Sequence, residues 1–283
     1  MTKNDFAVIV PAFNEAEVIP DLVRELREAF ERFGLDGEVI LVDDGSSDDT
    51  AAIAERESAG WDAFKVVKHN KNLGKTEAMI TGADATEKTA VVIFDADLQH
   101  TPSEIPRFLE KLSEGWDIVT GRKVGAYDKR GVSSVYNRLS RKIFDVPVSD
   151  LNSMKAFRRE VLDGLTLRHD WHRFFVVLAH SRGATVTEID IELHDRRAGE
   201  SKFQGPFRIL VGLMDLMSVG FLLLFSRKPL LFFGASGILM AGLGVFVAAI
   251  AVYLRFVHPM VGFDPYIPPM GYRPLLYLVM LLE

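Results

Sequence analysis

Residues 90–99 read AVVIFDADLQ, a short apolar run followed by two carboxylates, Asp95 and Asp97, and then by Gln99. An apolar run of this length is typical of a buried strand. Carboxylates at the end of such a strand, with an amide oxygen beside them, are ligands that Mg²⁺ and Mn²⁺ prefer. Because alternate residues of an extended segment point opposite ways, both carboxylates reach one ion only if the chain turns there.

The sequence around this stretch alternates strand-like and helix-like segments. The predicted strands are Phe6–Val10, Glu38–Val42, Phe64–Lys68, Ala90–Phe94 and Asp117–Thr120, and the predicted helices are Glu17–Phe33, Asp48–Ala59, Lys75–Ala85 and Ser103–Glu114. This alternation favours an α/β domain with a mostly parallel sheet. In such sheets ligands bind beyond the carboxyl ends of the strands.

Polar side chains follow each predicted strand. They are Asn14 and Glu15, then Asp43 and Asp44, then Asn72, then Asp95 and Asp97, and finally Arg122. The paired Asp43 and Asp44 fit hydrogen bonding to a nucleobase and ribose. A phosphorylated receiver domain is the rival interpretation, which the membrane segment described below disfavours. Neither a GxGxxG nor a GxxxxGK[ST] motif occurs, so neither a dinucleotide fingerprint nor a P-loop is indicated.

Three later segments allow two interpretations each. Residues 122–142 carry seven basic residues and one acid, which fits a solvated basic face or an anion site facing a membrane. Residues 195–202 read DRRAGESK and fit a juxtamembrane linker or a flexible phosphate clamp. Residues 169–174 mix histidine with aromatic residues, and we expect acceptor contact or membrane anchoring there rather than catalysis.

Composition excludes several classes of protein. Hydrophobic residues make up 48% of the 283 residues, too many for a disordered chain. The net charge of −6 argues against a nucleic-acid partner. Cysteine is absent, so disulfides and thiolate chemistry are excluded. The N-terminus lacks the apolar segment of a signal peptide.

The C-terminal part of the sequence predicts membrane attachment. Residues 230–254 contain no charge over 25 positions, which is long enough for a spanning helix. The apolar run 274–282 is too short to span, which indicates a second helix that is truncated. Residues 207–225 are apolar but interrupted by Arg208 and Asp215, so we expect interfacial helices, with a third spanning helix as the alternative.

These features predict three regions: a catalytic domain at 1–205, interfacial helices at 206–228 and a transmembrane region at 229–283. The basic residues Arg227 and Lys228 precede the spanning helix, and the positive-inside bias then places the large domain on the cytoplasmic face of a multi-pass protein.

Five motifs together resemble one known family. They are VPAFNE at 10–15, VDDGSSD at 42–48, NLGK at 72–75, DADLQ at 95–99 and R..GESK at 196–202. The chain resembles the inverting GT-A glycosyltransferases of family 2, in the dolichol-phosphate mannosyltransferase and polyprenyl-phosphate glycosyltransferase branch. The resemblance covers residues 6–205 and implies a Rossmann-like GT-A domain.

The resemblance implies a role for each matching residue. Nucleotide-sugar binding falls to Pro11, Asn14, Glu15, Asp43, Asp44, Lys75, Asp95, Ala96 and Asp97. The metal ligands are Asp95, Asp97 and Gln99, and the acceptor-phosphate residues are Arg122, Arg130, Ser134, Arg196, Ser201 and Lys202. Catalysis is assigned to Asp95, Asp97, Arg122 and Arg130. Asp150 matches an aspartate of the family, but the Gly-Phe pair that follows it there is missing here.

The implied reaction transfers a hexose from a nucleotide sugar to dolichyl or polyprenyl phosphate with Mg²⁺ or Mn²⁺. GDP-mannose is preferred as donor over UDP-glucose. The expected partners are this donor, the lipid phosphate, the bilayer and a second copy of the chain. Three rivals are weaker: a polysaccharide synthase normally carries a QxxRW segment, a sugar nucleotidyltransferase needs a glycine- and arginine-rich N-terminal loop, and an inactive scaffold need not keep these carboxylates.

Overall fold

The computed structural model describes residues 5–124, residues 146–194 except 149, 152 and 170, then 214, 217–221 and 229–257. The chain divides into two compact units, Met1–Leu216 and Met217–Glu283, and each is described by itself. The predicted boundary at 205 and 206 falls outside the described residues.

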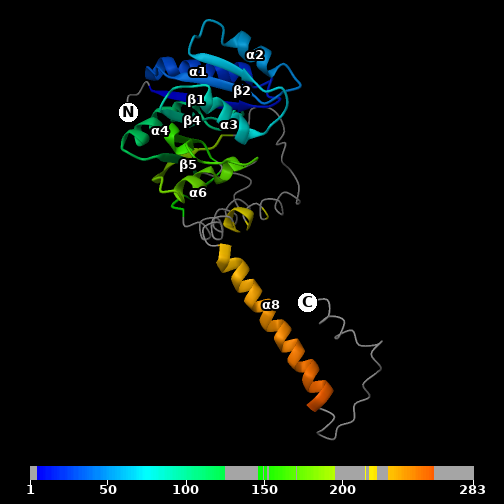
Figure 1. Ribbon diagram of the computed structural model, residues 1–283. Helices are drawn as coiled ribbons and strands as arrows, with labels where there is room; N and C mark the ends of the chain where they lie inside the picture. Colours follow the sequence, from blue (N-terminus) through cyan, green and yellow to red (C-terminus); the bar gives the residue numbers. More distant parts are fainter. Residues whose placement is uncertain are drawn as a thin grey trace. The chain divides into compact units, whose positions relative to one another are not determined.

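The first unit is built on a seven-stranded sheet with helices packed against it (Figure 1). The strands are β1 (Phe6–Ala12), β2 (Glu38–Asp43), β3 (Phe64–Lys68), β4 (Ala90–Ile93), β5 (Ile118–Val124), β6 (Lys155–Arg158) and β7 (Val186–Glu192). The helices are α1 (Ile19–Phe33), α2 (Thr50–Glu57), α3 (Lys75–Asp84), α4 (Ile105–Ser113) and α6 (Phe175–His180). The predicted α/β fold with a mostly parallel sheet is confirmed.

The strand order is β3-β2-β1-β4-β6-β5-β7. Strands β3, β2, β1 and β4 pair in parallel, and so do β5 and β7. Strand β6 lies between β4 and β5 and is antiparallel to both. The carboxyl ends of β1, β2, β3, β4, β5 and β7 therefore lie along one edge, and the first five of these are the strands that the sequence predicts.

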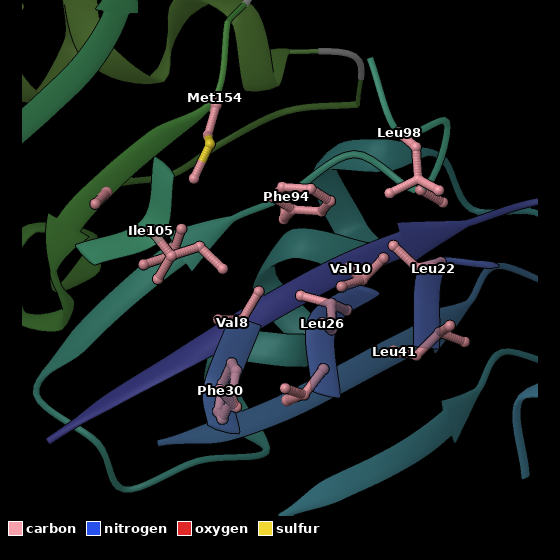
Figure 2. Packing of buried hydrophobic residues seen from close by; sticks show 14 of the residues in the cluster. Val8, Val10, Leu22, Leu26, Phe30, Leu41, Phe94, Leu98, Ile105 and Met154 are labelled. Carbon is pink, nitrogen blue, oxygen red and sulfur yellow. The ribbon is translucent and has the colours of Figure 1, made fainter. Parts of the chain in front are cut away.

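One face of the sheet is covered by α1. Leu22, Leu26 and Phe30 recur every four residues and so lie along one side of the helix. Figure 2 shows them packed toward Val8 of β1 and Leu41 of β2. All five are buried, and truncating one of the leucines or Phe30 to alanine would cost about 2–5 kcal/mol. This core fixes the strands whose ends form the site.

The opposite face of the sheet is covered by α3 and α6. A Cβ atom added to Gly82 of α3 would lie 2.3 Å from Ile9 Cγ2, so the missing side chain lets the helix approach β1 closely. The rings of Phe157 in β6 and Phe175 in α6 have their centroids 4.6 Å apart. Ile9 alternates with Val8 along β1, which is why one strand serves both faces.

The second unit contains α8 (Pro229–Val252), which continues into a π-helical turn at Tyr253–Val257. Residues Phe233–Arg255 form one helix that is long and apolar enough to cross a membrane, by length and composition. This agrees with the helix predicted at 230–254. Residues 217–221 are helical, but most of the predicted interfacial segment and the run 274–282 lie outside the described residues.

Candidate functional site

The turns that follow β1 and β2 are joined by hydrogen bonds. The backbone N–H of Asn14 donates to Ser46 Oγ at 2.9 Å, and Asn14 Oδ1 accepts from the N–H of Ser47 at 2.8 Å. The N–H of Glu15 donates to Thr50 Oγ1 at 2.9 Å. Asn14 has a φ of 52°, which is uncommon for a residue other than glycine. The two predicted nucleoside-binding motifs therefore form one connected surface.

The adjacent carboxylates Asp43 and Asp44 are both buried but have different partners. Asp43 Oδ1 accepts from the N–H of Ser46 at 3.2 Å. The donors to Asp44 are the N–H of Leu73 at 2.8 Å, the N–H of Gly74 at 2.7 Å and His69 Nδ1 at 2.7 Å. The nucleoside contacts of these two aspartates stay a prediction, but Asp44 clearly orders the segment before α3.

The carboxylates Asp95 and Asp97 follow β4, and Asp95 lies beside a lysine. Lys75 Nζ forms an ion pair with Asp95 Oδ1. Asp97 Oδ1 accepts from the N–H of Gln99 at 3.2 Å. Residues 96 and 97 form a turn, so the backbone turns between the two carboxylates as the sequence requires, and Leu98 after them has a φ of 52°.

Two lysines set the charge around Asp95. Burial alone would raise the pKa of the Asp95 carboxyl, but the charge and hydrogen bond of Lys75, with the charge of Lys155, hold it well below its usual range. Lys155 is only 4% exposed, and its Nζ donates to the carbonyl oxygen of Ser153 at 2.9 Å. Burial and the charge of Lys75 lower the pKa of Lys155 to about 8. Asp95 therefore carries its negative charge in a half-buried, cation-rich setting.

His172 packs against the start of α3. Its backbone N–H donates to Thr76 Oγ1 at 3.0 Å. Burial, followed by the charges of Lys75 and Lys155, lowers the pKa of the His172 imidazole well below its ordinary value. Trp171 is 9% exposed and Phe174 is fully buried. The expectation that these rings anchor the chain in a membrane is wrong, because they pack inside the domain.

At the other end of the same sheet edge, β5 and β7 present charged residues to solvent. Arg122 donates to Asp190 through Nε at 2.5 Å and Nη2 at 3.0 Å. This hydrogen bonding raises the pKa of Arg122 and lowers that of Asp190. Lys123 Nζ lies 3.4 Å from Asp150 Oδ2. Asp150 is thus buried beside a cation at this edge.

The structure brings several predicted residues together and leaves others aside. Pro11 pairs with Val42 in the sheet register, and Ala96 is buried between the two carboxylates. Four predicted acceptor residues and one shared with catalysis lie outside the described residues: Ser134, Arg196, Ser201, Lys202 and Arg130. Residues that the sequence reasoning missed are His69, Lys155 and Asp190. Lys155 stands in an otherwise apolar stretch, MKAF, which was an available signal.

The carboxylates fit a divalent metal ion. Mg²⁺ in proteins is commonly held by one or two carboxylates together with phosphate oxygens and water. Asp95 and Asp97 supply two such groups at a turn. Among the described residues, no group of three or more His, Cys, Asp or Glu side chains is placed to hold an ion. The remaining ligands would therefore come from Gln99, from a diphosphate and from water.

Comparison with known proteins identifies the family. Residues 7–179 match the model of glycosyl transferase family 2. The chain is 31% identical, over 88% of its length and 73% of the relative, to the undecaprenyl-phosphate 4-deoxy-4-formamido-L-arabinose transferase of Pseudomonas fluorescens (strain Pf0-1). It is 32% identical, over 88% of its length and 76% of the relative, to the enzyme of the same name from Enterobacter sp. (strain 638).

The fold also matches solved structures. Glucosyl-3-phosphoglycerate synthase from Mycobacterium tuberculosis, in complex with Mn²⁺, UDP and phosphoglyceric acid, superposes with a TM-score of 0.60 at 21% identity, over 79% of this chain and 78% of that one. This likeness concerns the fold. Together with the family match over residues 7–179, it shows that the chain belongs to glycosyl transferase family 2 and has a GT-A-like fold.

Proposed function

We propose that the chain transfers a sugar from a nucleotide sugar to a polyprenyl phosphate, with inversion at the anomeric carbon. The observation that carries the proposal is the edge where Asp97 and the ion pair of Asp95 with Lys75 lie beyond the same sheet as the Asp43 turn. Its relatives are named for undecaprenyl-phosphate transfer, and the similarity extends over 88% of the chain.

The donor half of the proposed site binds the nucleotide sugar. Asp43, Asn14 and Glu15 lie on the connected turns after β1 and β2 and are proposed to contact the nucleoside. Lys75 and Asp95 lie at the start of α3 and the end of β4, where the diphosphate is proposed to bind. Lys75 brings a positive charge to the leaving group, and a positioned charge of this kind stabilises developing negative charge.

A divalent ion, Mg²⁺ or Mn²⁺, would supply further neutralisation of the leaving diphosphate when bound. Asp95, Asp97 and Gln99 are the residues proposed to hold it. Solved structures of the same fold contain Mn²⁺ with UDP or Mg²⁺ with UDP, which supports this choice of ion.

The acceptor half needs positive charge rather than a strong base. The second pKa of a phosphate monoester is about 6, so at neutral pH most of the lipid phosphate is a dianion and already a nucleophile. The task left to the protein is to hold it in line with the sugar. Arg122 is the described residue proposed for this task, and Arg130, Ser134, Arg196, Ser201 and Lys202 complete the proposed set.

Two donors compete in this proposal. GDP-mannose follows from the dolichol-phosphate mannosyltransferase resemblance. A uridine diphosphate sugar is favoured by the UDP complexes of the same fold, and the named relatives transfer an arabinose derivative rather than mannose. We therefore place UDP-linked sugars first in the test and keep GDP-mannose, with dolichyl phosphate as its acceptor, as the alternative.

A lipid acceptor also accounts for the apolar helix of the second unit. Residues 233–255 are long enough to cross a bilayer. We propose that they anchor the catalytic unit to the membrane that carries the acceptor, with that unit on the cytoplasmic face of a multi-pass protein. Self-association of two copies is a further proposal of the same kind.

The test is a panel of labelled nucleotide sugars, UDP-linked and GDP-linked, incubated with undecaprenyl or dolichyl phosphate in detergent and with Mn²⁺ or Mg²⁺. We expect label to enter the lipid fraction with one donor and to depend on the metal ion. Label that stays in the aqueous phase with every donor would refute the proposal. Hydrolysis of the donor without lipid product would indicate a different acceptor.

A further inference from the structure

The segment that joins β3 to α3, residues 69–74, ends on a single buried carboxylate. Asp44 Oδ1 accepts the N–H of Leu73 at 2.8 Å, and Asp44 Oδ2 accepts the N–H of Gly74 at 2.7 Å. The Asp44 residue is 4% exposed. Hydrogen bonds from two consecutive amides to the two oxygens of one carboxylate fix both the position and the direction of the backbone.

His69 begins the same segment and closes it onto the same carboxylate. Its Nδ1 lies 2.7 Å from Asp44 Oδ1 and its Nε2 lies 2.9 Å from Thr81 Oγ1. Because a carboxylate oxygen only accepts, Nδ1 donates to Asp44, and Nε2 is within hydrogen-bonding distance of the threonine hydroxyl. The His69 side chain is only 8% exposed. Thr81 belongs to α3, so the ring connects the end of β2, the end of β3 and the helix.

Glycines let this segment lie directly on the turn after β2. Gly45 has a φ of 69°, and a Cβ atom there would lie 2.3 Å from the carbonyl carbon of Lys71. Gly74 has a φ of 98°, and a Cβ atom there would lie 2.7 Å from His169 Cε1. Both backbone conformations are ones that side-chain-bearing residues rarely adopt. The segment is thus held by contact as well as by hydrogen bonds.

The residue that follows the segment is Lys75, the first residue of α3. Its Nζ pairs with Asp95 Oδ1 beyond β4, and its side chain is 30% exposed. Since Gly74 is fixed by Asp44, the direction in which the lysine leaves the backbone is fixed as well. Asp44 and His69 therefore determine where the lysine charge stands in the proposed donor half.

We propose that His69 and Asp44 are positioning residues for sugar transfer: they hold the entry of α3 so that Lys75 reaches Asp95 and the donor diphosphate. The inference rests on the proposed function in its reference to the donor. It gives Asp44 a role that differs from the nucleoside contact implied by family resemblance. Neither residue touches the substrate in this assignment; both act through Lys75.

The test uses the full-length protein with His69→Ala, His69→Gln and Thr81→Val. For His69→Ala we expect kcat/KM for the donor to fall roughly tenfold, the effect of losing one hydrogen bond to a charged group, while KM for the lipid acceptor stays unchanged. Glutamine keeps a donor and an acceptor, so His69→Gln should recover part of the loss. Thr81→Val removes a single neutral hydrogen bond and should have the smallest effect. His180→Ala, which removes a ring whose Nδ1 lies 3.0 Å from the Ala184 carbonyl oxygen, is the matched histidine control.

Amide hydrogen exchange supplies a readout that does not depend on transfer. Loss of the ring should speed exchange at the Leu73 and Gly74 amides and leave the amides of β1 unchanged. Unchanged exchange at these two amides would overturn the proposal, and so would faster exchange with unaltered donor kinetics, because the contact would then be structural only. If His69→Ala fails to fold, amide exchange and donor kinetics are compared between Thr81→Val and His69→Gln instead, and the same two outcomes would overturn the proposal.

A failure of the proposed function is distinguishable from a failure of this inference. If the wild-type protein yields no lipid product, binding of UDP with Mn²⁺ is titrated to the wild-type protein and to His69→Ala. A roughly tenfold weaker binding by the variant supports the positioning role, and equal binding overturns it.

Discussion

The two ends of the site edge are constructed from the same kinds of charged residue in opposite ways. Around β2 and α3, Asp44 is 4% exposed and receives three hydrogen bonds. Around β5 and β7, Arg122 and Asp190 pair with side chains that are 52% and 49% exposed. The first arrangement is costly to disturb, because each buried donor left unpaired costs about 1–3 kcal/mol. The second is easily exchanged, because solvent-exposed ion pairs contribute little net stability.

The difference matches the two tasks of a transferase. A nucleotide sugar must be held in one geometry, so its proposed half is organised before the substrate arrives. A lipid phosphate must find its cation, and an arginine paired with an exposed carboxylate can change one anionic partner for another. The predictions below test whether the two halves differ in this way.

The largest effect is expected at the end of β4. Asp97→Ala should lower metal-dependent transfer by at least about a hundredfold, since it removes a charged group from the reacting centre. We expect the fold to be intact, because Asp97 lies beyond the end of β4 and is only partly buried. Transfer assays at saturating Mn²⁺ and a thermal melt measure the two expectations. Asp62→Ala, a change at an exposed acid, is the control.

An active Asp97→Ala protein would remove this carboxylate from the site and would weaken the division into two halves. A variant that is inactive and also melts early would show a structural role instead. Only loss of activity at an unchanged melting temperature agrees with the proposed metal ligand.

The next effect concerns stability within the donor half. Asp44→Ala leaves the amides of Leu73 and Gly74 and the ring of His69 without their acceptor, so we expect a loss of about 3 kcal/mol or more in the free energy of unfolding. Asp43→Ala removes one longer hydrogen bond, of 3.2 Å from the N–H of Ser46. We expect a loss of about 1 kcal/mol there. Urea unfolding in the same detergent measures the free energy of unfolding of both variants. Equal losses would contradict the greater structural role that we assign to Asp44.

Most of the fold could be predicted from the sequence, because the buried strands of a parallel sheet are short apolar runs that alternate with helical segments. The predicted strands at Phe6–Val10, Glu38–Val42 and Phe64–Lys68 lie within β1, β2 and β3 as the structure has them. Strand β6 was missed since it has only four residues and carries Lys155 and Arg158, so neither a continuous apolar run nor alternation is visible. Strand β7 alternates around Ile189 and Ile191, a period-2 signal that was present and overlooked.

The site was predicted only in so far as its residues are neighbours in sequence. Asp95 and Asp97 are recognisable in the sequence because they stand close together after an apolar run. The partners of Asp44 and Asp95 lie on other helices, strands and loops. Which residues meet there depends on the register of the strands and on where each helix begins, and no local sequence pattern encodes either. Lys155 is the sharpest case: a lysine in a strand is ordinarily taken for an exposed residue, whereas here it is buried beside the charge of Asp95.

His172, which packs against the start of α3, should make the stability of the protein depend on pH. The ordinary pKa of a histidine is 6.5, and that of His172 in the folded protein lies well below it. As the pH falls below about 6.5, His172 becomes protonated in the unfolded chain but stays neutral in the folded protein. The free energy of unfolding therefore decreases on acidification below this pH. We expect His172→Gln to lose less stability than wild type between about pH 7.5 and about pH 5.5.

Denaturant unfolding at the two pH values measures this difference. Parallel losses in the variant and the wild type would mean that the folded protein accommodates the imidazolium at this position. The burial of His172 and the charges of Lys75 and Lys155 would then be too weak to keep the imidazole neutral.

The smallest effect is expected at the exposed end of the edge. Asp190→Asn removes a charge that competes with a lipid phosphate for Arg122, so KM for the acceptor should fall a few-fold. KM for the donor and the melting temperature should stay unchanged, because the pair is exposed and far along the edge from the β2 and α3 contacts. Arg122→Ala should raise KM for the acceptor, which provides the opposite sign at the same place. If Asp190→Asn raises KM for the acceptor as well, Asp190 holds Arg122 in its working position, and the exposed half is then preorganised in the same sense as the buried one.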